Sequence, residues 1–490
     1  MASSGDTTGP RSVKAQFDDN FSATASAGAV LIEKVIRSLG LRKMFARCLP
    51  QRRGQYSSAD ICEQVVAGLL CAGKGFQAAE SLRRDPLLAR IFGHHKVAEE
   101  ATVWRAVCEM AGLDQRSFAE TYKPVGLAQA ALDLQGNEKK PAAHQRIVPD
   151  VPEAMSADRR RQFDELNEQV AVRCAQALPV QQMRLAGFVP VHGDGTAVEV
   201  RGDCFDAANK DYNGNKSLQL MTITMGPVYI GHRLLPGASD EGTALADLLS
   251  TSGQTVKKIA PRAPVLALLD AAFAEKLIVQ QMHGLGWNYI ICANQHRQVL
   301  ERLALQITAD QWSATGADAS RGWAESSVAI MRHQPQDWSQ AQVVIVRRYR
   351  LHDELEGMWH YSFLYTDLTS ELLPKKQVKK HGFAQYLWML YSTKQGRENT
   401  YKTWLTDMGG HHPASGRLGA SEAVCYFQAI AANAHTVISY RVMPKKERGI
   451  RHWRFVRDYV HLAGYLVMQA GRTLMVKLAG ADITDKARQL

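Results

Sequence analysis

The first part of the chain places apolar residues at the 3.6-residue spacing of an amphipathic helix. Ala29–Leu39 follows this spacing and stops at Gly40, a residue type that commonly ends helices. A second helix is expected to open at Ser58, with Asp60 in its first turn and without a full capping box. Further helices are predicted at 77–92, at 100–112 and, strongly charged, at about 156–178. The beginning of the chain therefore predicts a helical bundle.

A different pattern starts at residue 186, where short apolar runs replace the helical spacing. Such runs predict buried strands, and the turn signal at Gly226-Pro227 predicts a hairpin between two of them. In chain order we predict strands at 187–200, 218–225 and 228–235, a helix near 241–252, a strand at 263–270, a helix at 272–284 and a strand at 287–293. The order βββ-α-β-α-β is that of a ribonuclease-H-like fold, an α/β architecture in which helices cover a mixed sheet.

Residues 295–368 interrupt this order with two strong strand patterns, 342–351 and 357–366, and predict a β-rich insertion. Helices are expected again at about 382–408 and 420–437, before a strand-like stretch at 473–477. The expected divisions are a disordered start at 1–15, a helical domain at 16–135, a linker and helix at 136–180, a ribonuclease-H-like domain at 181–294 and 369–440, the insertion at 295–368, and a basic C-terminal segment at 441–490.

Three carboxylates occupy positions that make them candidates for chemistry. Asp194 interrupts one apolar run, Asp270 ends another, and Glu398 lies in a helical stretch between cationic residues. An unpaired carboxylate in a buried strand is costly, and a divalent metal ion is a common remedy. In a ribonuclease-H-like sheet the first and fourth strands are neighbours, so the two aspartates are expected to meet. Two Asp and one Glu around Mg²⁺ are suited to phosphodiester hydrolysis or transfer.

Composition narrows the class of protein. The chain has 490 residues, and 46% of them are apolar, which is ordinary for globular proteins. From this length we predict two to four domains, and we predict no membrane span. The eight cysteines are scattered and contain no Cys-x2-Cys pair, which argues against a zinc ribbon or a secreted disulfide framework and favours a reducing cytoplasm. Residues 371–490 hold ten Lys and nine Arg against eight acidic residues, so the whole net charge of +11 lies there. A polyanion is the expected partner of that quarter.

Five basic residues gather in the connection expected between the first two helices: Arg42, Lys43, Arg47, Arg52 and Arg53. A small helical bundle with a basic turn suits helix-turn-helix-like docking on DNA, and it equally suits a bundle that binds nothing. The histidine pairs His94-His95 and His411-His412 lack partners at metal-ligand spacing and are expected at the surface.

Several local motifs resemble the DDE transposases of bacterial insertion sequences, specifically the group with a β-rich domain inserted between the second Asp and the Glu. His192-Gly-Asp-Gly-Thr196 is similar to the first-strand motif, and Asp270-Ala-Ala-Phe273 to its Asp-x-x-Phe. Tyr391-x2-Lys394-x3-Glu398 resembles the family's Tyr-x2-Arg-x3-Glu signature, with Lys394 where Arg is usual. Weaker similarities lie at Tyr212-Asn-Gly, Gly237-x2-Asp240, Ala431-Ala-Asn433 and in the helical N-terminal part.

The resemblance implies a site and partners. Asp194, Asp270 and Glu398 would be the catalytic residues and would hold two Mg²⁺ ions, for which Mn²⁺ would substitute. The partner would be double-stranded DNA, namely transposon ends and target, bound by a homodimer in a synaptic complex in the bacterial cytoplasm at the nucleoid. Tryptophans of the insertion (Trp312, Trp323, Trp338 and Trp359) would contact transposon ends or pack in a core. The expected DNA-binding residues are Tyr391, Lys394, Arg397, Lys402, Arg42, Lys43, Arg52, Arg53, Lys445, Lys446, Arg451 and Arg454.

Each assignment has a structural alternative. Asp194-Gly195 is also a strong turn signal, Asp270 could cap the following helix, and Glu398 could pair on a surface with Lys394 and Lys402. At the level of function, the alternatives are a structure-specific, metal-dependent nuclease on the same fold and a domesticated DNA-binding protein without catalysis.

Overall fold

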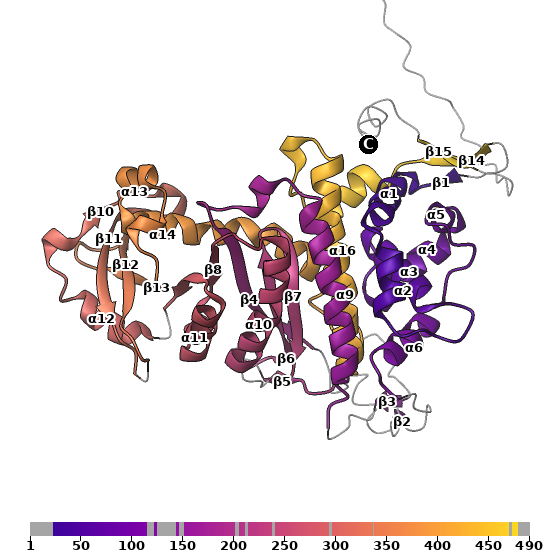
Figure 1. Cartoon of the computed structure of the whole chain (residues 1–490), viewed down its shortest axis with the longest axis horizontal. Helices are drawn as coiled ribbons and strands as arrows, with labels where there is room; N and C mark the ends of the chain where they lie inside the picture. Colours follow the sequence, from indigo (N-terminus) through magenta and orange to yellow (C-terminus); the bar gives the residue numbers. More distant parts are fainter. Residues whose placement is uncertain are drawn as a thin grey trace, which may run out of the picture.

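The computed structural model describes residues 23–114, 122–124, 144–146, 151–200, 205–210, 214–237, 241–293, 296–336, 338–469 and 473–478. The expected disordered start, most of the expected linker, and the motif residues Tyr212 and Asp240 lie outside these ranges. The molecule is elongated, with a helical end, a central sheet and a β-rich end (Figure 1).

The helical end begins as the sequence predicts and then differs. Helix α1 (Val30–Leu39) ends at Gly40, whose φ of 73° lies in the left-handed region that glycine tolerates. Helix α2 (Leu41–Cys48) follows at once, so Arg42, Lys43 and Arg47 lie on a helix and not in the expected connection. The expectation was wrong because the stripe formed by Leu41, Phe45 and Cys48 is short, and tertiary burial makes it a helix.

Two further details correct the sequence prediction for this bundle. Helix α3 (Ser58–Leu70) has a full capping box. Ser57 is its N-cap, and the Asp60 carboxylate accepts a hydrogen bond from the Ser57 backbone N–H. The segment predicted as one helix at 77–92 is broken between α4 (Ala78–Arg84) and α5 (Pro86–Ile91), because Pro86 cannot continue a helix. His94 is buried at 7% exposure rather than at the surface, and helix α6 spans Glu100–Met110.

The central sheet has the predicted order. Its strands are β4 (Val189–Glu199), β6 (Lys216–Met225), β7 (Val228–Leu235), β8 (Val265–Leu269) and β9 (Asn288–Cys292). Strand β4 pairs antiparallel with β6 and parallel with β8, which in turn pairs parallel with β9. Strand β7 pairs with β6, and the spatial order β7-β6-β4-β8-β9 is the ribonuclease-H-like arrangement. The fold class expected from the sequence is therefore confirmed.

Helices cover this sheet and join it to the helical end. Helix α10 (Glu241–Ile259) is longer than predicted, and α11 (Lys276–Leu285) starts later because Ala271–Phe273 forms a separate 3-10 turn. Helices α9 (Ala157–Gln176) and α16 (Leu418–Val442) contact β7 on one side and reach α2 and α3 respectively on the other (Figure 1). The sheet and the helical end consequently share a continuous hydrophobic core.

The β-rich end extends the central sheet. It contains α12 (Arg297–Ala304), β10 (Ser313–Ala314), β11 (Trp323–His333), β12 (Gln342–Leu351) and β13 (His360–Thr366). Strand β13 pairs antiparallel with β9, so the inserted strands continue the same hydrogen-bonded sheet. Strand β11 was not predicted, because its mixed polar sequence becomes a strand only through its long pairing with β12.

The helix predicted at 382–408 is a series of shorter elements. Helix α13 (Lys375–His381) precedes α14 (Phe383–Ser392), which is followed by a 3-10 turn (Thr393–Arg397), α15 (Glu398–Lys402) and a π-helical turn (Thr403–Asp407). The change of helical pitch rotates successive side chains and allows the backbone that carries Lys394 and Glu398 to follow the sheet edge.

The end of the chain returns to its beginning. After α17 (His452–Phe455), strands β14 (Gly464–Gln469) and β15 (Thr473–Leu478) form a small sheet with β1 (Ala23–Thr24), beside α1 and α5 (Figure 1). A second small pair, β2 (Tyr122–Pro124) with β3 (His144–Arg146), lies beyond α6. Across the described parts of the chain, every helix is too short or too polar to cross a lipid bilayer.

Candidate active site

Sheet pairing brings the two aspartates together. The parallel register aligns Gly193 of β4 with Leu269 of β8, and the next residue on each strand is Asp194 and Asp270. Gly193 permits this alignment, since a Cβ atom there would stand 2.7 Å from Leu269 Cδ2. Asp194 lies within β4, so its interpretation as a turn residue is wrong. Asp270 makes no side-chain capping hydrogen bond to the turn that follows it, so the capping interpretation is wrong as well.

Two side chains from the segment after the insertion close over the aspartates. Lys394 forms an ion pair with Asp270 Oδ2, and its Nζ lies 3.7 Å from Asp194 Oδ1. The Tyr391 hydroxyl donates a hydrogen bond of 3.2 Å to Asp270 Oδ1. The Lys394 side chain is only 12% exposed. Lys394 is therefore a largely buried partner of the two aspartates.

The pKa values of the two carboxyl groups in this shared site shift in opposite directions. Burial raises the pKa of Asp194 to about 7, against the attraction of Lys394 and with the help of a hydrogen bond shared with Asp270. Burial also opposes ionisation of Asp270, but the Lys394 ammonium and the hydrogen bonds from Asp194 and Tyr391 outweigh it, and its pKa is lowered. Near neutral pH, Asp270 is thus ionised, whereas Asp194 holds a proton more readily than an ordinary aspartate.

The aspartates line a cavity of about 330 Å³ that sequence reasoning described only in part. Tyr391 and Lys394 line it as expected, but Arg321, Trp388 and Tyr401 line it too. Arg321 comes from the inserted segment, so the insertion reaches the carboxylates. The sequence offered no signal for Arg321, because it stands in a short turn more than a hundred residues after β4, and only the pairing of the sheet brings it there.

The donor set suits a hard divalent cation in part. Two carboxylates converge on one cation, Lys394, and carboxylate oxygens are the ligands that Mg²⁺ and Mn²⁺ prefer. Within the described residues, no group of three or more His, Cys, Asp or Glu side chains forms a metal cluster. Glu398 begins α15, one helical turn after Lys394, and the side chains of Arg397 and Glu398 lie outside what the structure describes. Glu398 as the third ligand stays a prediction.

The basic residues expected to bind DNA fall into two groups. Some hold carboxylates: Arg42 pairs with Asp60 and Glu63, Arg52 with Glu109, Arg451 with Asp407 and Arg454 with Asp458. Others are exposed, namely Lys43, Arg53, Lys445 and Lys446, while Lys402 ends α15. DNA contact stays a prediction for all of these residues. The charges of the exposed residues are more accessible to a DNA phosphate than those held by carboxylates.

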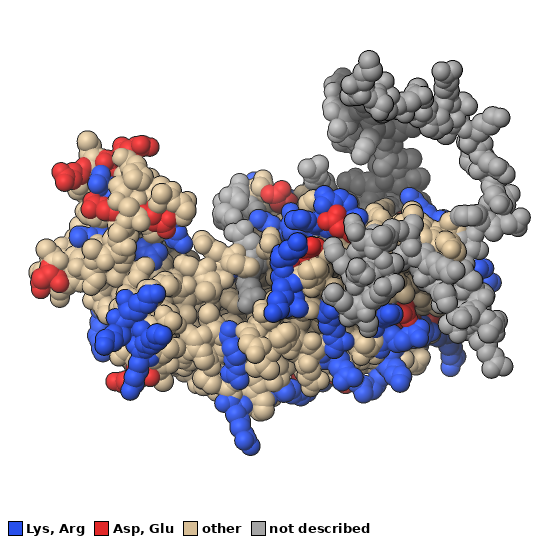
Figure 2. Space-filling model, turned by 90° about the horizontal axis from the view of Figure 1, so that it is seen from above, with Lys and Arg blue, Asp and Glu red and all other residues tan. Residues whose placement is uncertain are grey.

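The insertion's tryptophans pack against arginines rather than standing free. Arg348 lies over the rings of Trp312 and Trp359, at 4.1 and 4.4 Å from their centroids, and Trp338 is buried beside Tyr365. Trp323 stacks on Tyr349 and faces Arg321. Figure 2 shows acidic side chains at the outer end of this region, with Lys and Arg gathered on its flank and along the middle of the molecule.

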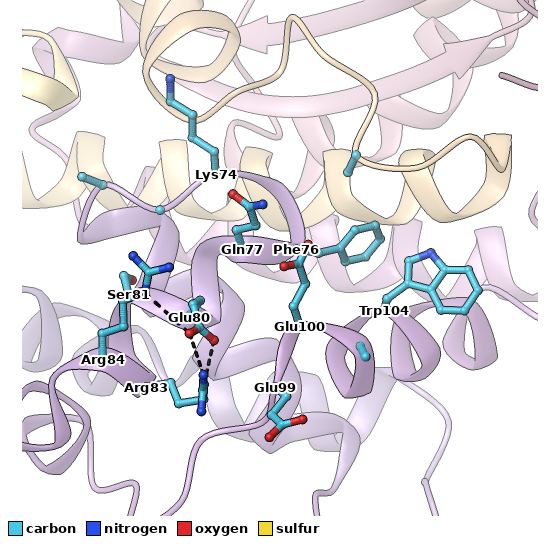
Figure 3. A pocket seen from close by; sticks show the side chains of 14 residues that line it. Lys74, Phe76, Gln77, Glu80, Ser81, Arg83, Arg84, Glu99, Glu100 and Trp104 are labelled. Atoms are coloured by element: carbon cyan, nitrogen blue, oxygen red, sulfur yellow. Dashed lines mark hydrogen bonds and ion pairs between the residues drawn. The ribbon is translucent and has the colours of Figure 1, made fainter. Parts of the chain in front are cut away.

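A larger cavity, of about 1200 Å³, lies at the helical end (Figure 3). Its charged side chains pair among themselves, as Glu80 does with Arg83 and Arg84. It shares no lining residue with the carboxylate cavity. We therefore place the chemistry at the aspartates and not at the larger opening.

Comparison with known proteins finds similarity to transposases outside this site. A family model described as transposase DDE domain group 1 matches residues 6–152, which include the helical end but not the three carboxylates. No curated protein matches the chain. Similar solved structures include the piggyBac transposase synaptic complex with hairpin DNA, at 12% identity and TM-score 0.39, covering 89% of this chain and 79% of that one. The Mos1 transposase paired-end complex with left transposon end is 14% identical, with TM-score 0.17, covering 46% of this chain and 76% of that one. These TM-scores are too low to support the fold, which rests on the strand order. Over residues 6–152, less than half of the chain, the sequence is similar to transposase DDE domain group 1.

Proposed function

We propose that the chain is a DNA transposase that cleaves DNA at the inverted-repeat ends of a transposon and joins the resulting 3′-OH ends to target DNA. The observation that carries this proposal is the meeting of Asp194 and Asp270 on neighbouring parallel strands, with Lys394 held between them. The family match to DDE-domain transposases supports it.

The cofactor we propose is Mg²⁺, two ions, with Mn²⁺ as a substitute. Asp194, Asp270 and Glu398 would hold them. Bound there, the ions would supply Lewis-acid activation of the attacking oxygen and charge neutralisation at the leaving oxygen.

The chain's own residues have distinct tasks around these ligands. Asp194 must lose its proton before it can act as a ligand, and its pKa of about 7 places that step near neutral pH. Lys394 is a compact cation on a flexible stem, so it can leave the carboxylates and contact a phosphate oxygen. Tyr391 orients Asp270 through its hydroxyl, and Trp388 and Tyr401 narrow the cavity and reduce the access of water.

The partners we propose are double-stranded transposon ends and target DNA, bound by a homodimer in a synaptic complex. Phosphate contacts would come from exposed cations, in particular Lys43, Arg53, Lys445 and Lys446. Arg397 and Lys402, beside Glu398, would contact the strand nearest the carboxylates. The location we propose is the bacterial cytoplasm at the nucleoid, following the resemblance to transposases of bacterial insertion sequences.

The test is a strand-transfer assay with Mg²⁺ and DNA carrying the inverted repeats that flank the gene. We expect Asp194→Ala, Asp270→Ala and Glu398→Ala each to lose cleavage and joining by at least about a hundredfold, as loss of one charge-stabilising group commonly does. Asp353→Ala, at an exposed turn of the insertion, is the matched control and should keep full activity. Wild-type activity in the three variants would refute the site.

Two other results of the same assay would replace the proposed function. Cleavage that never leads to joining would identify a structure-specific nuclease. Specific DNA binding with no cleavage, under any divalent metal, would identify a DNA-binding protein without catalysis. In both cases the reaction products, separated on a denaturing gel, decide between the possibilities.

A further inference from the structure

Arg347 is a buried cation that forms no ion pair with a carboxylate among the described residues. It lies on β12 with only 5% of its surface exposed, and its Nε has no hydrogen-bond partner. Its one side-chain hydrogen bond, from Nη2 to Gln385 Oε1, is 3.3 Å long and reaches a neutral group. The nearest charged neighbours include a second cation, Arg321. A guanidinium buried in this way loses solvation that the attraction of Asp318 does not make up for, since its pKa is lowered.

Aromatic rings hold Arg347 in place but do not neutralise it. Its guanidinium carbon lies 4.3 Å from the centre of the Trp388 ring and 5.4 Å from that of Trp323. Such contacts give directional attraction, worth less than an ion pair with its hydrogen bonds. Burial, together with Arg321, lowers the pKa of Arg347 to about 10 against the attraction of Asp318, so the group is still a cation at neutral pH.

The cation faces a cavity of about 450 Å³ between the insertion and α14. Hydroxyl and amide groups line this cavity with the two arginines, in particular Ser326, Thr393 and Gln385. The one carboxylate in its wall, Asp318, is engaged by Ser320 and by Arg321. With two arginines and one carboxylate in its wall, the cavity keeps an excess of positive charge, which fits a phosphate group.

The cavity adjoins the carboxylate cavity. Arg321 and Ser392 line both of them. Trp388 completes the connection, because it lines the carboxylate cavity and its ring packs on Arg347. The two cavities therefore meet along a seam between the insertion and α14. A ligand that extends from the aspartates along this seam meets Arg321 first and Arg347 next.

We propose that the seam cavity of Arg321 and Arg347 is an anion-binding subsite that takes a backbone phosphate of the nucleic acid strand lying beside Asp194 and Asp270. The insertion then binds the same nucleic acid strand that lies beside α14 and the two carboxylates. This assignment rests on the proposed function for the identity of the strand, but not for the binding of phosphate.

The first test measures thermal unfolding of the full chain with inorganic phosphate, in the absence of divalent metal. Phosphate should raise the wild-type midpoint by about 2 °C or more relative to chloride at equal ionic strength. It should raise the midpoint of Arg347→Met by much less. In phosphate-free buffer, Arg347→Met should unfold at or above the wild-type temperature, since it removes an uncompensated charge. Equal phosphate shifts in both proteins would overturn the subsite.

Two further variants keep this test decisive. Arg321→Met, with a partly exposed side chain, should also reduce the phosphate shift and serves if Arg347→Met does not fold. Arg332→Met removes one charge from the exposed face of the neighbouring strand β11, away from the cavity, and should retain the full shift. A reduced shift in Arg332→Met equal to that in Arg347→Met would mean a general charge effect and overturn the subsite.

The second test separates a strand phosphate from free phosphate. Binding of a duplex with a single-stranded extension is measured by fluorescence anisotropy over a range of salt concentrations, in EDTA. Arg347→Met should lower the magnitude of the slope of log K against log salt by about 1, and Arg332→Met should change it less. An unchanged slope with a lost phosphate shift would overturn the strand assignment and leave a site for free phosphate. Both tests omit metal, so they stand or fall independently of the strand-transfer assay.

Discussion

The two ends of the molecule compensate buried charge in opposite ways. In the helical half, Arg160 holds the carboxylate of Glu422 through two hydrogen bonds of 2.8 and 2.9 Å, and His452 is buried as a neutral ring against Leu70 O. At the insertion, Arg347 is buried as a cation against two tryptophans and a cavity. A base that is paired or neutral leaves no uncompensated charge in the interior, whereas we propose that the uncompensated Arg347 awaits an anionic ligand.

The largest expected effect concerns Arg160. Glu422 is 1% exposed, so Arg160→Met would leave a buried carboxylate without its cation and should cost about 3–5 kcal/mol in the free energy of unfolding. Urea unfolding measures this loss. Adding Glu422→Gln should restore part of it, because the amide carries no charge. Arg161→Met is the matched control, since that residue pairs with Asp158 at the surface, and should change stability by less than about 1 kcal/mol. Equal effects at both positions would contradict the comparison.

A smaller effect is expected from His452. Burial, acting against its hydrogen bond with Leu70 O and the attraction of Asp407, lowers its pKa from 6.5 to about 4. A lowered pKa means that the unfolded chain takes up the proton first. Its contribution is therefore complete above pH 6.5 and is lost as the pH falls toward 4. His452→Asn should reduce the pH dependence of unfolding in that window by up to about 1.4 kcal/mol per pH unit. An unaltered pH profile would show that this histidine is not buried neutral.

The smallest effect is expected from Arg42. Its side chain is 51% exposed, although it pairs with Asp60 and Glu63. Arg42→Met should therefore cost only about 0–1 kcal/mol in urea unfolding. For Arg42→Met, the slope of log K for DNA binding against log salt should stay close to that of the wild type. Lys43→Met, at the next and exposed position, should lower the magnitude of that slope by about 1 if the helical end binds DNA. A lowered slope in Arg42→Met with an unaltered one in Lys43→Met would reverse the distinction between paired and available cations.

The sequence predicted the central sheet better than its surroundings. The apolar runs around Asp194 and Asp270 are unambiguous because a strand buried on both faces tolerates few polar residues, and their order implied that the two strands would pair. Helix α2 and strand β11 were not predicted, since their patterns are short or mixed and tertiary contacts decide them. The contact of Lys394 with both aspartates was also missed, because the motif suggested a phosphate contact and sequence spacing cannot reveal an ion pair across the sheet edge.

By itself the sequence determined the ribonuclease-H-like order and the candidacy of Asp194 and Asp270, because hydrophobic patterning and the cost of a buried charge are local properties that the chain displays directly. Tertiary structure alone decided which cations are committed to carboxylates and which are left to face a cavity. Arg160 and Arg347 are the same residue type in the sequence. They differ because one meets Glu422 across two packed helices and the other meets tryptophan rings across the insertion seam, and such partners are chosen by packing between distant segments.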